Sequence, residues 1–266
     1  MCLFTLDVED VSDTNIFARS LGDRQFLVYE MKYASKAELA MVLPIPVPPG
    51  SPEDAVRFVS FEKCIGFFGE LDRGFPRDSI VLGGDIEMLS MNDLTVRPTT
   101  LEVHDVGAYE ASFVPTVADF GRLDERFRLP ANIWLELNTY RDYGFAVFKL
   151  RATGLHREHP LAFEFPTRHP DRLFFPTMHL HDRRLKRTAQ YDHTLYCQPS
   201  HAMQWFMEGW EDSPEAADRF MLKPCAREFV DLELSCWRTK LRGERQNADS
   251  WIGKGAGLPR SAIELA

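Results

Sequence analysis

The stretch that decides the fold is RQFLVYEMKYASKAELAMVLPIPVPP, residues 24–49. Its first half alternates between apolar and charged or polar residues, so one face of a strand would carry Leu27, Tyr29, Met31 and Tyr33. A second apolar run, residues 39–43, ends in a series of prolines that cannot continue a hydrogen-bonded ladder. We therefore predict an antiparallel pair of strands that leads into a stiff, polyproline-like exit.

A later stretch, YGFAVFKLRATGLHREHPLAFEFP, repeats this layout over residues 143–166. It again places an alternating run before a shorter apolar run, and a proline closes the second run in both stretches, at Pro44 and Pro166. A duplicated strand-pair unit is one interpretation, although alternating strands also arise independently.

Short helices are expected between and after these stretches. Apolar residues recur at helical spacing within residues 61–76, 116–130, 131–140, 200–210 and 213–221. Strand patterns dominate elsewhere, at residues 99–115, 172–182, 189–198 and 229–241. The sequence therefore predicts an α+β fold with mainly antiparallel β-sheet and several short helices. Its length suits one large domain over residues 1–266, or two packed halves of about 1–140 and 141–266.

Composition narrows the class of protein. The 44% of hydrophobic residues and 27% of charged residues are ordinary for a soluble globular chain. A net charge of −9 opposes binding to a phosphate backbone, so nucleic acid is not an expected partner. The start, MCLFTLDVEDVSD, lacks the pattern of a secretory signal, and no stretch is apolar enough to span a membrane. We expect a cytoplasmic protein whose five cysteines are free thiols.

Three stretches, taken in order, carry a resemblance to a known family. They are VYEMKYASKAELAMVLPIPVPPG with its proline exit, VGAYEASFVPTVADFGRLDERFRLP with its VGxY strand, and YRDYGFAVFKL. Together they resemble an uncharacterised bacterial family, a domain of unknown function with an amino-terminal Cys before the first strand. The resemblance covers about residues 1 to 180. It implies a fold grouping, and no reaction comes with it.

The first candidate site is a group of histidines near the end of the apolar run FFPTMHLHD, residues 174–182. On a strand, His179 and His181 share one face and could reach one ion. His193 and Cys197 likewise share one face of the following strand. If residue 179 lay opposite residue 193 in an antiparallel pair, two or three imidazoles and a thiol would converge.

Such a group favours zinc, and an open coordination position would make the site catalytic. In that case Asp182 or Asp192 would orient a ligand or act as a base. A slip of one residue in register would dissolve the site. The alternative is that these are strand histidines beside a solvated basic turn.

The second candidate is Cys2. Removal of Met1 would leave a thiol and an α-amine on one residue, the arrangement of an amino-terminal nucleophile that attacks amides. A third candidate is the cationic loop after the histidines, an anion-binding site formed by Arg183, Arg184, Lys186 and Arg187. The alternatives are a small apolar residue that begins a strand, in the case of Cys2, and a solvated turn in the case of the loop.

The sequence therefore supports two classes of function. In the first, the chain is a binding or scaffold module that presents its strand pairs to a protein partner. In the second, it is an enzyme, either a zinc-dependent hydrolase built on His179, His181 and His193 or an amidohydrolase that acts through Cys2. The binding module is the main prediction, because neither catalytic group is complete in the sequence.

Overall fold

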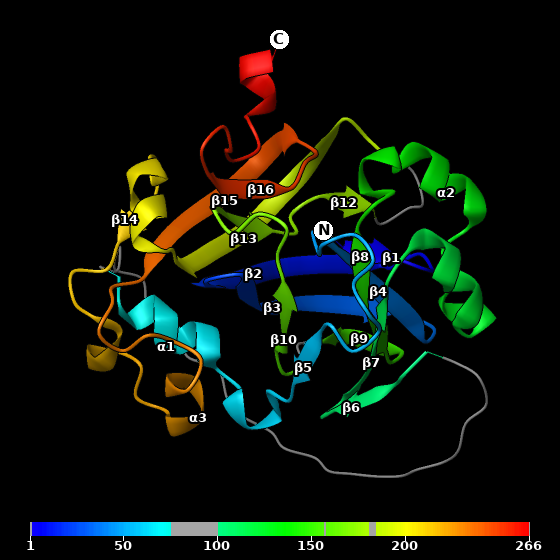
Figure 1. The fold of residues 1–266 in the computed structure, drawn as a ribbon, viewed down its shortest axis with the longest axis horizontal. Helices are drawn as coiled ribbons and strands as arrows, with labels where there is room; N and C mark the ends of the chain where they lie inside the picture. The colour runs from blue at the N-terminus through cyan, green and yellow to red at the C-terminus, as the bar shows by residue number, and fades with distance from the viewer. Residues whose placement is uncertain (1, 76–100, 157, 181–184, 266) are drawn as a thin grey trace.

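Two β-sheets that face one another organise the chain (Figure 1). The computed structural model describes residues 2–75, 101–156, 158–180 and 185–265. Within these residues, one sheet has six strands in the order β12 (His179–Leu180), β1 (Cys2–Phe4), β4 (Leu39–Ile45), β8 (Gly144–Leu150), β7 (Tyr109–Val114) and β6 (His104–Val106). Its pairs are antiparallel except for β1 with β12, which run parallel.

The second sheet has eight strands among the described residues. Along its path lie β14 (Glu211–Asp212), β15 (Trp237–Gln246), β13 (Thr188–Gln198), β2 (Asp10–Leu21), β3 (Arg24–Ser35), β10 (Leu161–Pro166) and β5 (Arg57–Val59), and β9 (Thr153–His156) pairs with β3. Only β13 and β2 pair in parallel. A small third sheet joins β11 (Arg172–Phe175) to β16 (Ser250–Gly253). Strands from before and after residue 140 occur in both large sheets.

The helical segments are short. They are the α-helices α1 (Phe67–Arg73), α2 (Ala131–Glu136) and α3 (Pro224–Arg227), and the 3₁₀ turns η1 (Glu62–Cys64), η2 (Val117–Arg122), η3 (Glu125–Phe127), η4 (Asn138–Tyr140), η5 (His201–Phe206), η6 (Ala217–Arg219) and η7 (Ala262–Leu265). The predicted α+β class with mainly antiparallel sheet is confirmed. None of the helices in the described part of the chain has the length and apolarity that a bilayer crossing needs.

The main core lies between the two large sheets. Alternate residues of each strand face it, as in β4, where Met41 and Leu43 point inward while Ala40 and Val42 point to the opposite face. The rings of Phe148 in β8 and Phe163 in the other sheet lie 5.7 Å apart, so the sheets touch through aromatic side chains.

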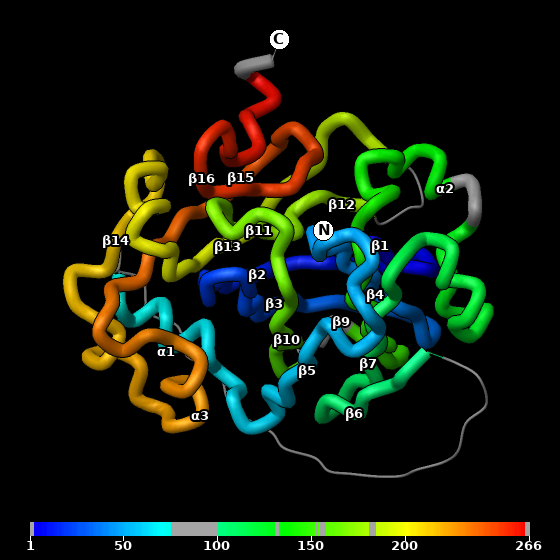
Figure 2. The backbone as a smooth tube through the Cα atoms, in the orientation of Figure 1, coloured from blue at the N-terminus to red at the C-terminus, as the bar shows by residue number. Residues whose placement is uncertain are grey.

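The outer face of each sheet is also covered. Phe17, Val28 and Tyr196 of the eight-stranded sheet pack in one cluster with residues of α1 and α3. On the other side of the molecule, α2 and η2 cover Val42 and Val147 of the six-stranded sheet. Figures 1 and 2 show α1 and α3 on one side and α2 on the other. Because both faces of β4 are covered, all of its residues are buried.

The predicted pairing within the opening stretch is wrong. The face of β3 that carries Leu27 and Tyr29 does point into the core, as predicted, but β3 and β4 lie in different sheets. The same holds for β8 and β10 in the later stretch. Instead β4 pairs with β8, and β3 pairs with β10. Each stretch thus crosses from one sheet to the other, and a duplicated unit is not shown.

Several other expectations need correction. Residues 116–130, 200–210 and 213–221 form 3₁₀ turns where helices were expected, and residues 229–236 are not a strand. Strand β2, a central strand of 12 residues, was not predicted from the sequence. Its first part contains three acidic or hydroxyl residues in a row, Ser12, Asp13 and Thr14, and a register shift between Ser12 and Asn15, so it lacks a clean alternation.

Candidate functional site

His179 and His193 meet across the two large sheets. His179 begins β12 and His193 lies in β13, and their ring centroids are 4.8 Å apart with an angle of 61° between the planes. The ring of Tyr191 lies 4.7 Å from that of His179 and 5.1 Å from that of His193. We call His179, Tyr191 and His193 the histidine cluster.

The predicted register does not produce this contact. Strand β12 pairs in parallel with β1, which places Cys2 opposite His179. Strand β13 pairs with β15 and β2, and His193 lies opposite Leu241. The expected pairing of residue 179 with residue 193 is therefore wrong. The two rings meet because the sheets pack face to face, and Tyr191 and Leu195, on the same face of β13 as His193, belong to the core between them.

The side chain of Asn247 holds the backbone of His179. Its Oδ1 accepts a hydrogen bond from the His179 N–H at 2.7 Å, and its Nδ2 donates to the His179 carbonyl at 2.9 Å and to the Lys186 carbonyl at 3.0 Å. A carboxamide offers both donors and an acceptor, so Asn247 supplies the bonds that a neighbouring strand would otherwise provide. This explains how a strand of two residues can have a fixed position.

The side chain of Asp249 holds the two residues before His179. Its Oδ1 accepts from the backbone N–H groups of Thr177 and Met178, each at 3.0 Å, and the Tyr140 hydroxyl donates to its Oδ2 at 2.6 Å. Burial, and then the charge of Asp249, raise the pKa of Tyr140 well above its usual value. Residues 247–249, between β15 and β16, therefore fix the entry to β12.

The imidazole of His193 is buried in the core. Only 1% of its surface is exposed, and this burial lowers its pKa below the usual 6.5. Its Nδ1 lies 3.5 Å from Oδ1 of Asp192, which is longer than an ordinary hydrogen bond. The guanidinium of Arg242 donates to the backbone carbonyl of His193 and also to the Thr194 hydroxyl, at 3.1 Å.

The structure brings together two of the four predicted metal ligands. Cys197 lies four residues along β13 from His193, about 13 Å at the rise of a strand, so it cannot share an ion with the cluster. Burial also raises the pKa of Cys197 well above its usual value, which disfavours the thiolate that binds metal. His181 lies outside the described residues. Elsewhere in the described part, no three His, Cys, Asp or Glu side chains are placed to hold an ion.

The other predicted site residues stay predictions. Asp182, Arg183 and Arg184 lie outside the described residues, while Lys186 and Arg187 are exposed in the segment before β13. Cys2 begins β1, as expected for a first strand, and its backbone lies between those of β12 and β4 in the sheet.

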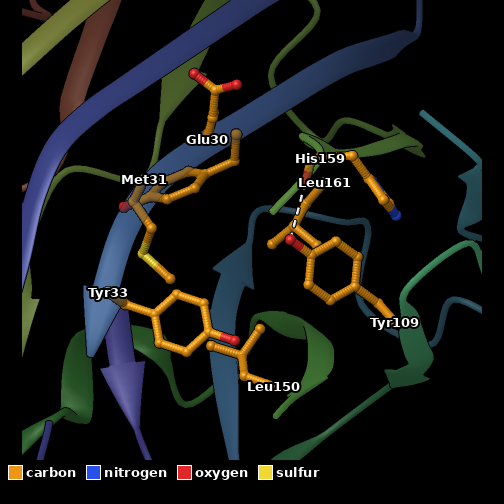
Figure 3. Close-up of a pocket in the computed structure, with 8 residues that line it drawn as sticks. Glu30, Met31, Tyr33, Tyr109, Leu150, His159 and Leu161 are labelled. Atoms are coloured by element: carbon orange, nitrogen blue, oxygen red, sulfur yellow. Dashed lines mark hydrogen bonds between the residues drawn. The ribbon is translucent and has the colours of Figure 1, made fainter. Parts of the chain in front are cut away.

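His159 has a structural role (Figure 3). Its Nε2 accepts from the Ala108 N–H at 2.8 Å, and its Nδ1 lies 2.9 Å from the Pro160 carbonyl, which fixes the tautomer. The Tyr109 hydroxyl donates to the His159 carbonyl at 2.8 Å. A Cβ at Gly107, where φ is +68°, would lie 2.5 Å from the imidazole, so only glycine fits there. The void beside these residues, about 10 Å³, holds no more than a water molecule.

A larger pocket of about 170 Å³ lies over the six-stranded sheet. Ala40 and Val147 form part of its apolar lining, and the turns η2 and η3 contribute Leu123 and Phe127. The cations around it are already paired: Lys149 contacts Glu110 at 2.9 Å, and the guanidinium of Arg126 contacts Asp124 at 2.8 Å. It offers no free charge for a ligand among these residues.

Four residues of the site and its support were not predicted from the sequence: Tyr140, Tyr191, Asn247 and Asp249. A short polar run between two strands, NAD at 247–249, is typical of a turn and gives no sign that its side chains replace a strand.

Comparison with solved structures shows a similarity of fold to a known protein. No family model matches the chain. A crystal structure of baculovirus P35 matches with a TM-score of 0.50 and 14% sequence identity, over 95% of this chain and 99% of that one. A mutated baculovirus P35 after caspase cleavage matches with a TM-score of 0.47 and 13% identity, over 91% and 99% of the two chains. P35 in a complex with caspase-8 matches at 0.42 and 12%, over 91% and 96%. This chain is thus similar in fold to P35 along nearly its whole length.

Proposed function

We propose that this chain is a protein-binding module whose partner is a protease of the caspase class. The observation that supports the proposal is the similarity of fold to P35 over 95% of this chain and 99% of that chain. P35 forms a complex with caspase-8, and a mutated P35 is known in a form cleaved by a caspase. A chain that a protease cuts has occupied its active site, so P35 meets its partner there.

The scaffold suits a binding role. The connections β3–β4 and β8–β10 each cross between the large sheets, and their strands pair with each other, β4 with β8 and β3 with β10. The two stretches of similar layout, residues 24–49 and 143–166, each contribute one of these crossings. Together the two crossings tie both sheets to one core. A framework held in this way loses little conformational freedom on binding, which favours affinity.

The surface around η5 carries the aromatic side chains that a protein partner would contact. Trp205 is 85% exposed and Phe206 is 45% exposed, while Met203 in the same turn is buried and anchors it. Tryptophan is enriched among the residues that dominate interface energies. We place part of the contact at these two rings.

The experiment is gel filtration of the chain mixed with active caspase-8, followed by intact mass analysis of each fraction. The proposal expects a peak that contains both proteins and a chain cut at one bond. Caspase-8 whose catalytic cysteine has been alkylated is the control, and it should give no cut. Separate elution of two uncut proteins with the active protease would contradict the proposal.

A further inference from the structure

A buried hydroxyl, that of Ser112, lines the pocket over the six-stranded sheet. Ala111 and Phe113, its neighbours in β7, belong to the core between the two large sheets, so the alternation of a strand turns Ser112 to the outer face, opposite Val147 of β8. Ser112 is 5% exposed, and no hydrogen bond joins its side chain to another residue in the described part of the chain. A ligand that bonds to this hydroxyl would recover the free energy that its burial costs.

The other buried residues of the lining are apolar. They are Ala40, Leu101, Leu123 and Val147. A buried water molecule needs several polar partners to be held in place, and this part of the lining offers it the single hydroxyl of Ser112. The pocket therefore suits an apolar group that carries one polar atom.

The charged residues of the lining are more exposed, and they stand in pairs of opposite sign. As well as the pairs of Lys149 and Arg126 described above, the guanidinium of Arg122 contacts the carboxylate of Glu53 at 2.6 Å. An ionised ligand would have to break one of these pairs or be buried without a counter-charge, whereas a neutral ligand leaves every pair intact. The charges thus favour a neutral ligand.

The turn that forms one wall of the pocket is fixed by contacts within the chain. The guanidinium of Arg128 donates two hydrogen bonds to the Leu123 carbonyl, from Nε at 2.8 Å and from Nη2 at 2.6 Å. Two cations lie over the Phe127 ring, with the Arg126 guanidinium 5.2 Å and the Lys149 ammonium 5.7 Å from its centroid. Because this wall is already ordered, little conformational freedom is lost when a ligand binds.

We propose that this pocket binds a small neutral ligand with one aromatic ring and one hydroxyl group, a phenol. The volume of about 170 Å³ suits such a ring, because an apolar cavity of about 150 Å³ accommodates benzene. The ring lies against Leu123 and Val147, and its hydroxyl forms a hydrogen bond with that of Ser112. This inference does not depend on the proposed partner.

The test is isothermal titration calorimetry of the whole chain with three probes of one ring each: phenol, toluene and benzoate. Phenol should bind saturably at one site. Toluene should bind about 5-fold more weakly, because it leaves the Ser112 hydroxyl without a partner. Benzoate should also bind more weakly than phenol, because its carboxylate would be buried beside ion pairs that are already complete.

Methyl signals in ¹H–¹³C spectra show where phenol binds. Those of Ala40, Leu123 and Val147 should shift as phenol is added. The signals of Leu27, which lies in the core between the two large sheets, should stay unchanged.

Variants separate recognition by the hydroxyl from binding to an apolar space. Ser112→Ala should bind phenol about 5-fold more weakly and should lose the preference for phenol over toluene. Ser12→Ala, at a partly exposed serine of β2, is the matched control and should keep the preference. Ala40→Leu fills the pocket and should weaken the binding of both probes, with the methyl spectrum as the check that the variant is folded.

Four outcomes would overturn the proposal. They are no binding of phenol, equal affinities of the unsubstituted chain for phenol and toluene, tighter binding of benzoate than of phenol, and methyl shifts confined to other parts of the chain. A preference for phenol that persists in Ser112→Ala would likewise remove the assigned role of this hydroxyl.

Discussion

The Tyr140 hydroxyl donates a hydrogen bond to the Asp249 carboxylate at 2.6 Å, across 109 positions of sequence. The bond joins η4, which follows α2, to the loop between β15 and β16. Because Asp249 also accepts from the N–H groups of Thr177 and Met178, one carboxylate ties three separate segments together at the entry to β12.

Replacing Asp249 by alanine should lower the free energy of unfolding by about 2 to 4 kcal/mol, because it leaves buried donors without an acceptor. Asp249→Asn keeps one oxygen for the two N–H groups and should cost roughly half as much. Urea unfolding followed by tryptophan fluorescence measures both. Asp105→Ala, at an exposed aspartate in β6, is the control and should change the free energy by less than about 0.5 kcal/mol. Equal effects of Asp249→Ala and Asp105→Ala would show that the hydrogen bonds of Asp249 contribute nothing to the free energy of unfolding.

The burial of His193 should make stability depend on pH. Its folded pKa is lower than 6.5, so as the pH falls below about 6.5 the unfolded chain takes up a proton that the folded chain does not. The free energy of unfolding should therefore fall between pH 7.5 and pH 5, and the loss should level off only below the folded pKa.

His193→Gln should reduce this pH dependence, measured as the difference in urea midpoint between pH 7.5 and pH 5. The exposed His201, replaced in the same way, should leave the dependence as it is. If His193→Gln and the unsubstituted chain lost the same stability over this range, the assigned cause would be wrong.

The histidine cluster should not retain zinc at stoichiometric levels, because its two imidazoles are fewer than the three protein ligands of a catalytic site. Metal analysis after zinc loading and gel filtration tests this. One equivalent of zinc that is lost in both His179→Ala and His193→Ala, but kept in His201→Ala, would contradict the prediction and revive the zinc-dependent hydrolase.

Trp205→Ala should weaken binding to the protease at least about 10-fold, as truncation of a central interface tryptophan commonly does. Its stability should not change, because the ring is exposed. Leu135→Ala is the matched control: the side chain is 83% exposed but belongs to α2, and its loss should leave binding unchanged. Surface plasmon resonance with immobilised caspase-8 compares them. Equal affinities of the two variants would show that Trp205 in η5 is not part of the contact with the protease.

The sequence predicted the class of fold but not the partners of its strands. Alternation in β3 showed which face is buried, and this holds because side chains alternate whatever the neighbouring strand is. Whether β3 pairs with β4 or with β10 depends on which sheet each strand joins, and the local pattern carries no information about that.

The candidate site shows the same limit. His179 and His193 could be singled out by residue type, but their contact arises from packing between sheets rather than from register within one sheet. The hydrogen bonds from the backbone at Thr177 and His179 to the side chains of Asp249 and Asn247 could not be predicted. In the sequence, polar residues that take the place of a neighbouring strand have the same pattern as any polar turn.

The measurement that tests the central claim most directly is a titration of caspase-8 with this chain, read as the residual rate of cleavage of a fluorogenic peptide. Because the proposed contact involves the protease active site, the rate should fall with added chain and approach zero near molar equivalence. An unchanged rate at large molar excess of the folded chain, after prolonged incubation, would contradict the account.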